Sequence, residues 1–96
     1  MMKDKLYFKG FVDRNRENLK SHLNAGYIDY SKEGYLTLID IISNEISNPE
    51  QDKESLKIVV KDLANEVMDL RDIFNDEVVY ESFFQNKKII NFIENN

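Results

Sequence analysis

The feature that most constrains the fold of this sequence is a long run of apolar residues at helical spacing within positions 49–75. Successive residues of the run lie four or three positions apart, so all of them share one face of an α-helix; they are Leu56, Val60, Leu63, Val67, Leu70 and Phe74. Val59, Ala64 and Ile73 widen this face beyond the narrow seam of a coiled coil. The pattern predicts a helix about 40 Å long that buries one face in a globular core.

Residue types typical of helix ends mark both ends of this helix. Asn48 is suited to the N-cap, Pro49 to the first helical position and Gln51 to the third position of a capping box. Asn75 and Asp76 follow the last apolar residue, and Asp76 is also suited to cap the next helix. We therefore expect this helix to begin at Pro49 and to end at Asn75.

Three further segments show helical periodicity. Residues 31–47 open with Ser31, a favourable N-cap, and carry a broad apolar face. Residues 4–24 and 77–94 form the first and the last predicted helix. Residues 86–88 interrupt the last one, which leaves a short final helix as an alternative.

The connections between the predicted helices are short, near residues 25–30, 47–48 and 75–76. Short connections favour antiparallel neighbours, as in up-and-down helical bundles. A chain of 96 residues has room for one domain. We therefore predict an all-α, antiparallel four-helix bundle, with residues 1–96 as a single helical domain.

The composition excludes several kinds of chemical site. The sequence has no cysteine, which excludes a disulfide scaffold, a thiolate zinc site and a cysteine nucleophile. Its one histidine, His22, borders the apolar face of the first predicted helix, where a packed or rim position is expected. The three glycines stand apart, so there is no glycine-rich phosphate loop. We expect a protein that is not an enzyme and that holds no cofactor or metal.

Two observations bear on localisation. No run of apolar residues approaches the roughly 18 that a membrane-spanning helix needs. The apolar stretch near the N-terminus is broken by Lys9 and Gly10, unlike the uninterrupted centre of a secretory signal. The expectation is therefore a cytoplasmic protein that does not bind a membrane.

Charge is distributed unevenly along the chain, which has 13 basic and 18 acidic residues and a net charge of −5. Residues 1–26 carry six basic and three acidic side chains, interleaved as on an ordinary exposed helix face, although such bases also suit an anionic partner. The middle of the chain is acidic. This argues against direct nucleic-acid binding, because phosphates are neutralised by clustered lysine and arginine. It favours a protein partner with a basic surface.

Within the helix predicted over 49–75, one face is rich in carboxylates. These acids follow one another at spacings of four, three and seven residues, which places them on one face; this acidic stripe consists of Asp62, Glu66, Asp69 and Asp76, with Asp72 at its edge. A row of negative charge steers and docks a basic surface. The alternative is a solvated outer face that Lys61 and Arg71 partly neutralise.

Tyrosines cluster between the first and second predicted helices. Tyr27, Tyr30 and Tyr35 lie close together in a segment that also contains Asp29. Tyrosines among acids are suited to binding hot spots, and Tyr30 is the one we expect to be exposed. In the alternative, Tyr35 belongs to the core and the others cover the end of the bundle. The predicted partner-binding residues are Asp29, Tyr30, Asp62, Glu66 and Asp69.

The segment 29–39 reads Asp-Tyr-Ser-Lys-Glu-Gly-Tyr-Leu-Thr-Leu-Ile and resembles a stretch of the helical immunity proteins of nuclease colicins. In that family a helix opens with Asp-Tyr-Ser or Asp-Tyr-Thr, followed by an acidic residue and an aromatic one. The resemblance implies a small, acidic, four-helix protein that binds its cognate nuclease through acidic and tyrosine residues. The family's His-Pro stretch and Tyr-Tyr-Pro turn are absent from this sequence.

Together these features predict a non-enzymatic inhibitor that binds another protein. Its most concrete form is an immunity or antitoxin-like protein that neutralises a basic bacterial toxin domain. One alternative is a phage or mobile-element inhibitor of a host nucleic-acid machine, whose carboxylates imitate phosphates. A second alternative is a homo-oligomeric regulatory or structural module, such as a homodimer formed through the apolar face of the helix over 49–75.

Overall fold

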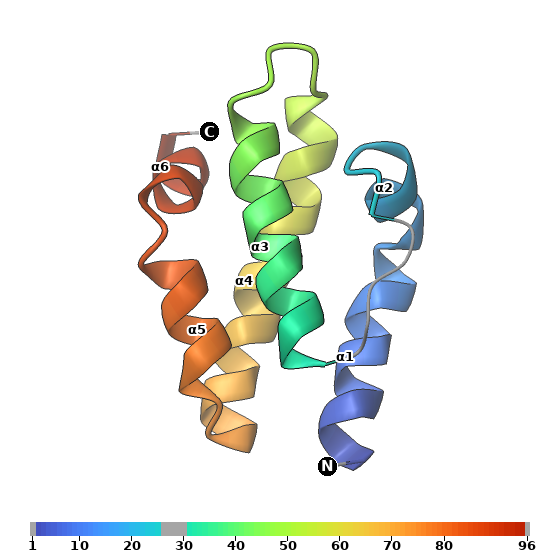
Figure 1. Cartoon of the computed structure of the whole chain (residues 1–96), viewed down its shortest axis with the longest axis vertical. Helices are drawn as coiled ribbons and strands as arrows, with labels where there is room; N and C mark the ends of the chain where they lie inside the picture. The colour runs from blue at the N-terminus through green and yellow to red at the C-terminus, as the bar shows by residue number, and fades with distance from the viewer. Residues whose placement is uncertain (1, 26–30, 96) are drawn as a thin grey trace.

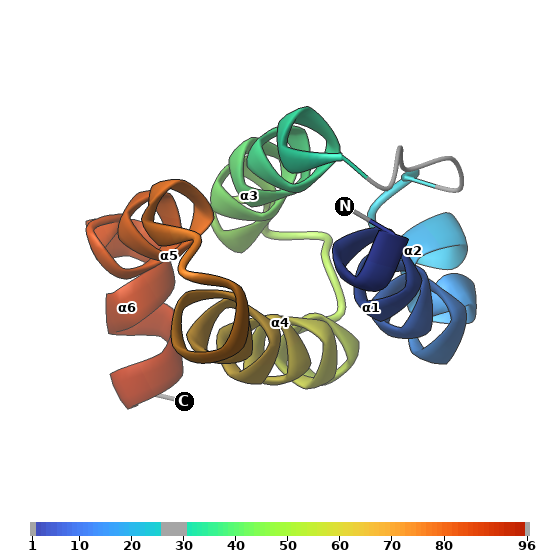
Figure 2. The same ribbon diagram turned by 90° about the horizontal axis from the view of Figure 1, so that it is seen from below.

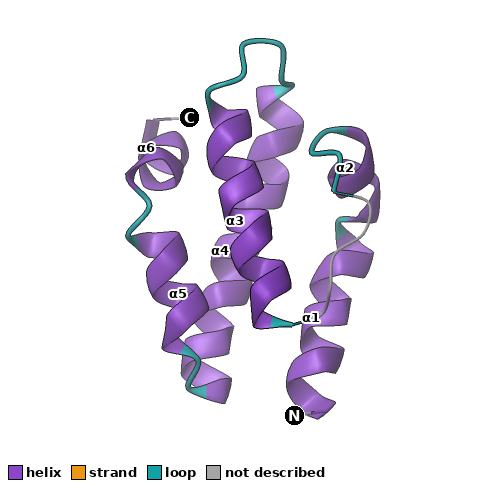
Figure 3. Cartoon of the chain, in the orientation of Figure 1, coloured by secondary structure: helices purple, strands orange, loops and turns teal. Residues whose placement is uncertain are grey.

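The computed structural model describes residues 2–25 and 31–95, with side chains described for residues 7–25 and 31–95. Within these ranges the chain consists of six α-helices joined by loops, and none of it is β-strand (Figure 1 and Figure 3). The helices are α1 (Met2–Arg14), α2 (Arg16–Ser21), α3 (Lys32–Ile46), α4 (Lys53–Phe74), α5 (Glu77–Phe84) and α6 (Lys87–Asn95). The all-α prediction is confirmed.

The six helices form three groups. α3 and α4 lie in the middle of the molecule, with α1 and α2 on one side and α5 and α6 on the other (Figure 1 and Figure 2). Tyr7 contacts Asp69 while Arg14 contacts Asp62, so α1 runs antiparallel to α4. α3 is also antiparallel to α4, and therefore α1 and α3 run in the same direction (Figure 1). The strictly alternating order expected from the short connections is not confirmed.

The first and the last predicted helix are each divided in two. α1 ends at Arg14 and α2 begins at Arg16, on either side of Asn15. The carbonyl of Phe11 accepts both the side-chain amide of Asn15 at 2.9 Å and its backbone N–H at 3.1 Å, and side-chain bonds of this kind bend helices. Asn86 Oδ1 accepts a hydrogen bond from the Ile89 N–H at 3.2 Å where α6 begins. The break between α5 and α6 is the predicted alternative, whereas the break at Asn15 was not predicted.

The start of α4 differs from the prediction. Asp52 is the N-cap, and its carboxylate accepts hydrogen bonds from the backbone N–H groups of Glu54 at 3.1 Å and Ser55 at 3.3 Å. Asn48 instead accepts a bond from the Glu50 N–H at 3.0 Å within the preceding loop. Asp and Asn are both good caps. Because the Asn48 side chain closes a turn within the loop, the helix begins at the second capping residue, Asp52.

Three other predicted helix ends are confirmed. Ser31 caps α3 by accepting a hydrogen bond from the Gly34 N–H at 3.3 Å. Asn75 ends α4 in the left-handed conformation, with φ of 57°. Asp76 then caps α5 by accepting a bond from the Val78 N–H at 3.2 Å. A short polar connection thus reverses the chain between α4 and α5.

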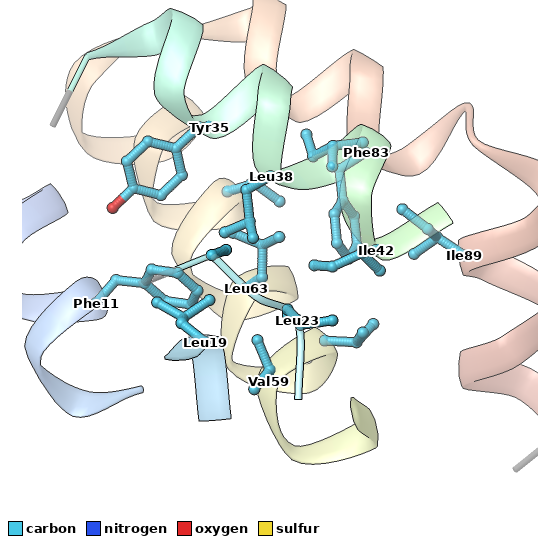
Figure 4. Close-up of a cluster of buried hydrophobic side chains, with 14 of the residues drawn as sticks. Phe11, Leu19, Leu23, Tyr35, Leu38, Ile42, Val59, Leu63, Phe83 and Ile89 are labelled. Atoms are coloured by element: carbon cyan, nitrogen blue, oxygen red, sulfur yellow. The ribbon is translucent and has the colours of Figure 1, made fainter. Parts of the chain in front are cut away.

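The core lies between the three groups of helices. Figure 4 shows buried side chains converging from all of them, namely Phe11, Leu19, Leu23, Tyr35, Leu38, Ile42, Val59, Leu63, Phe83 and Ile89. The apolar face predicted within 49–75 forms the α4 side of this core. Ile73, which we expected to widen that face, is 60% exposed. In the described residues no helix combines the length and hydropathy that crossing a membrane requires.

Candidate functional site

The predicted partner-binding residues fall into two sets. Asp29 and Tyr30 lie outside the described residues, as does Tyr27. Asp62, Glu66 and Asp69 lie on one face of α4, as their spacing predicts, but α1 packs against this face. The structure therefore brings these three acids together at the junction of α1 and α4.

Asp62 is the main partner of Arg14. The guanidinium donates from Nε to Oδ2 at 3.1 Å and from Nη2 to Oδ1 at 3.2 Å, a two-point contact between a half-exposed arginine and a more buried aspartate. The Asn15 amide adds a hydrogen bond to Oδ2 at 2.6 Å. The bond from Asp62 raises the pKa of Arg14 above its usual value, so this cation stays charged and fixes α1 to α4.

Glu66 is buried, so the prediction that it faces outward, toward solvent or a partner, is wrong. Glu66 is only 1% exposed. Its Oε1 lies 3.4 Å from Arg14 Nη2 and its Oε2 lies 3.4 Å from the Tyr35 hydroxyl. Burial raises the pKa of Glu66 to about 7, because the charged form loses its hydration; Arg14 and Tyr35 oppose the rise and Asp62 adds to it. Glu66 therefore changes charge in the neutral pH range.

Tyr35 joins α3 to this cluster and is fully buried, as in the alternative that places it in the core. Its hydroxyl points toward α1 (Figure 4) and donates to the Phe8 carbonyl at 2.7 Å. The rings of Phe8 and Phe11 pack on it, with centroids at 4.5 and 5.7 Å. Burial and the nearby Glu66 raise the pKa of Tyr35, so its hydroxyl keeps its proton.

Asp69 and Asp76 are also engaged within the chain. Asp69 accepts a hydrogen bond from the Tyr7 hydroxyl, and the Tyr7 ring packs edge-on against Phe74 at 5.6 Å. Asp76 is buried as the cap of α5 and forms an ion pair with Lys32 at 3.7 Å. The acidic stripe of the sequence is therefore mostly an intramolecular junction rather than a free face.

The part played by α1 was not predicted from the sequence. The basic residues of 1–26 were expected on an exposed face or at an external anion, yet Arg14 binds the acids of α4 in the same chain. One signal was present: the net positive charge of residues 1–26 is opposite in sign to that of residues 49–76. Opposite charges on two predicted helices favour their packing against each other.

Exposed carboxylates without such contacts lie on α3 and α5 and also elsewhere on the described chain, at Glu17, Glu50, Glu54 and Glu94. Glu33, Asp40, Glu77 and Glu81 are exposed, and none of them forms an ion pair with the part of the chain that the structure describes. An open groove of about 430 Å³ runs between the two helices and is lined by Leu36, Ile39, Asp40, Ser82, Gln85 and Asn86. We call the four carboxylates of α3 and α5, together with the groove, the α3–α5 face.

Two other features of the sequence are placed by the structure. His22 is half-buried at the end of α2, the rim position expected for it, and its backbone carbonyl accepts a hydrogen bond from the Gln51 side chain. Among the described side chains no group of three or more His, Cys, Asp or Glu residues is arranged to hold a metal ion. No protein-family model, curated protein or solved structure matches this chain.

Proposed function

We propose that this chain is a non-enzymatic inhibitor that binds another protein, most concretely an immunity or antitoxin-like protein that neutralises a basic toxin domain. The observation that carries the proposal is the α3–α5 face, where four exposed carboxylates lack an ion pair within the described residues. In a chain with a net charge of −5, such a face attracts a basic surface and accelerates its association. The resemblance of residues 29–39 to colicin immunity proteins points in the same direction.

The proposed docking surface differs from the one inferred from sequence spacing. Glu66 has no exposed side-chain surface with which to contact a partner. Asp62 and Asp69 keep exposed edges beside α1 and stay as secondary contacts. Asp29 and Tyr30 lie outside the described residues and stay partner-binding residues predicted from the sequence.

The proposal is tested first by identifying the partner. The purified chain serves as bait in an extract of its native cells, and the captured proteins are identified and quantified by mass spectrometry. One small basic protein in near-equal amount supports an immunity-like function. A nuclease or polymerase assembly, with DNA competing for the same site, supports the phage-inhibitor alternative. A bait that captures only itself, together with a dimeric mass in light scattering, supports the homo-oligomeric module.

The second test locates the docking surface with two variants of equal charge. One combines Glu33→Gln, Asp40→Asn, Glu77→Gln and Glu81→Gln; the matched control neutralises four exposed acids elsewhere, Glu17, Glu50, Glu54 and Glu94. We expect the first variant to slow association with the captured partner about tenfold at low salt, and the control to slow it far less. Equal slowing by both variants would show that only net charge matters and would refute docking on the α3–α5 face.

We also propose a description of the architecture as a four-helix bundle with two broken members. α1 with α2, and α5 with α6, each span a segment whose apolar periodicity is that of a single helix. The breaks at Asn15 and Asn86 are supported by side-chain hydrogen bonds of these two residues. Substituting Asn15 by Ala would remove its side-chain bond to the Phe11 carbonyl, and an increase in helical circular dichroism would support a helix that is continuous apart from this residue.

A further inference from the structure

The groups around Glu66 offer too few hydrogen-bond donors to satisfy its ionised carboxylate. Tyr35 has a single hydroxyl proton, and its nearer acceptor is the Phe8 carbonyl at 2.7 Å rather than Glu66 at 3.4 Å. Arg14 is likewise closer to Asp62, at 3.1 and 3.2 Å, than to Glu66, at 3.4 Å. An ionised carboxylate is an acceptor only. The charged form of Glu66 is therefore buried with one long contact to a half-exposed cation.

The protonated form of Glu66 satisfies the same groups. A neutral carboxyl carries one O–H donor, which can donate to the Tyr35 oxygen while Tyr35 continues to donate to the Phe8 carbonyl. This chain of hydrogen bonds runs from α4 through α3 to the backbone of α1. Bonds in such a chain strengthen one another inside a protein. Protonation thus adds a link between three helices and removes a buried charge.

We propose that Glu66 acts as a proton-operated latch, which fastens α1 to α3 and α4 when it is neutral and loosens α1 when it is ionised. The groups that face it are Tyr7 and Arg14 from α1, Tyr35 from α3, and Asp62 and Asp69 from its own helix. Arg14 alone among them favours the ionised form by its charge. This inference goes beyond the proposed function and does not depend on the identity of any partner.

The latch operates in the neutral range. Burial raises the pKa of Glu66 to about 7, so the folded chain holds this proton below that pH and loses it above. The carboxyl of an unfolded chain titrates at its ordinary pKa, well below 7. Between about pH 6 and pH 8 the protonated, latched form gives way to the ionised form, and the equilibrium for opening shifts about tenfold. The loosened helix is the one that covers Asp62 and Asp69.

Amide hydrogen exchange followed by NMR tests the latch helix by helix. After correction for the intrinsic exchange rate, we expect protection at the Phe11 and Val12 amides of α1 to fall about tenfold from about pH 6 to pH 8. Protection at the Val79 and Phe83 amides of α5, which exchange when the whole chain unfolds, should fall with the same pH dependence but stay well above that of α1 at each pH. In Glu66→Gln, a side chain of the same shape without a charge, α1 protection should not depend on pH. Glu94→Gln, at an exposed position, should behave as the unmodified chain.

Two results would overturn this proposal. The first is equal protection in α1 and α5 at each pH, which would show that α1 opens only when the whole chain unfolds and is not released on its own. The second is unchanged pH dependence of α1 in Glu66→Gln. The carboxyl carbon shift of Glu66 in the unmodified chain gives a check that needs no variant. A titration midpoint near pH 7 supports the latch, and a midpoint at the ordinary value for glutamate refutes it.

Discussion

Replacing Glu66 by Gln should change how the free energy of unfolding depends on pH. The pKa of Glu66 lies at about 7 in the folded chain, against 4.5 for the unperturbed side chain. Because the folded state binds this proton more tightly, the group's contribution to stability is complete below about pH 4.5 and is lost as the pH rises through about 7. A difference of about 2.5 pH units corresponds to about 3 kcal/mol.

The assay is urea denaturation followed by helical circular dichroism, at several values between about pH 5 and pH 8.5. Over this interval the linkage relation predicts that the unmodified chain loses about 2 to 3 kcal/mol of stability through Glu66. Several acids have a lowered pKa, among them Asp13, Glu45 and Asp52. They act in the opposite direction but at lower pH, since their contribution is lost only as they become protonated.

Glu66→Gln should remove most of this loss, since the amide carries no charge and can still donate to the Tyr35 oxygen. The variant should therefore be more stable than the unmodified chain at the alkaline end by about 2 kcal/mol or more. Glu94→Gln serves as the control, because Glu94 is exposed. Parallel stability curves for the unmodified chain and Glu66→Gln would refute the assignment of the pH dependence to this residue.

Three further predictions concern the fold. Leu63→Ala should lower the free energy of unfolding by about 2 to 5 kcal/mol, because Leu63 is fully buried. Ile58→Ala, at a 60% exposed position, should change it by less than about 0.5 kcal/mol. Equal losses in urea denaturation would contradict the assigned core. Asp52→Ala should cost about 1 kcal/mol by removing the cap of α4, a loss that would be absent if the helix began at Pro49. Tyr35→Phe should cost about 1 kcal/mol by removing the buried hydrogen bond to the Phe8 carbonyl. A thermal melt identical to that of the unmodified chain would exclude this bond.

The helices of this protein could be predicted because their signals are local. Apolar residues spaced three or four apart share a helix face wherever the helix lies, so Leu56, Leu63 and Leu70 were identified as core residues and are buried. Ser31, Asn75 and Asp76 act through bonds to residues within a few positions along the chain. The start of α4 was misplaced because two good capping residues lie close together, and neither residue type alone shows which one begins the helix.

The surroundings of the acidic stripe depend instead on contacts across the chain. Spacing correctly placed Asp62, Glu66 and Asp69 on one face of α4, but the same spacing is compatible with water, a partner or another helix on that face. The structure shows that α1 covers it, with Tyr35 of α3 completing the enclosure of Glu66.

Sequence alone therefore determined where the helical segments lie and most of the residues that face the core, because these depend on neighbours along the chain. Tertiary structure decided which carboxylates are exposed and which are buried. It also decided the protonation behaviour of Glu66, since the pKa of a carboxyl follows from its loss of hydration and from charges that other helices bring to it. A glutamate that reads as surface charge in the sequence thus becomes a titrating group inside the fold.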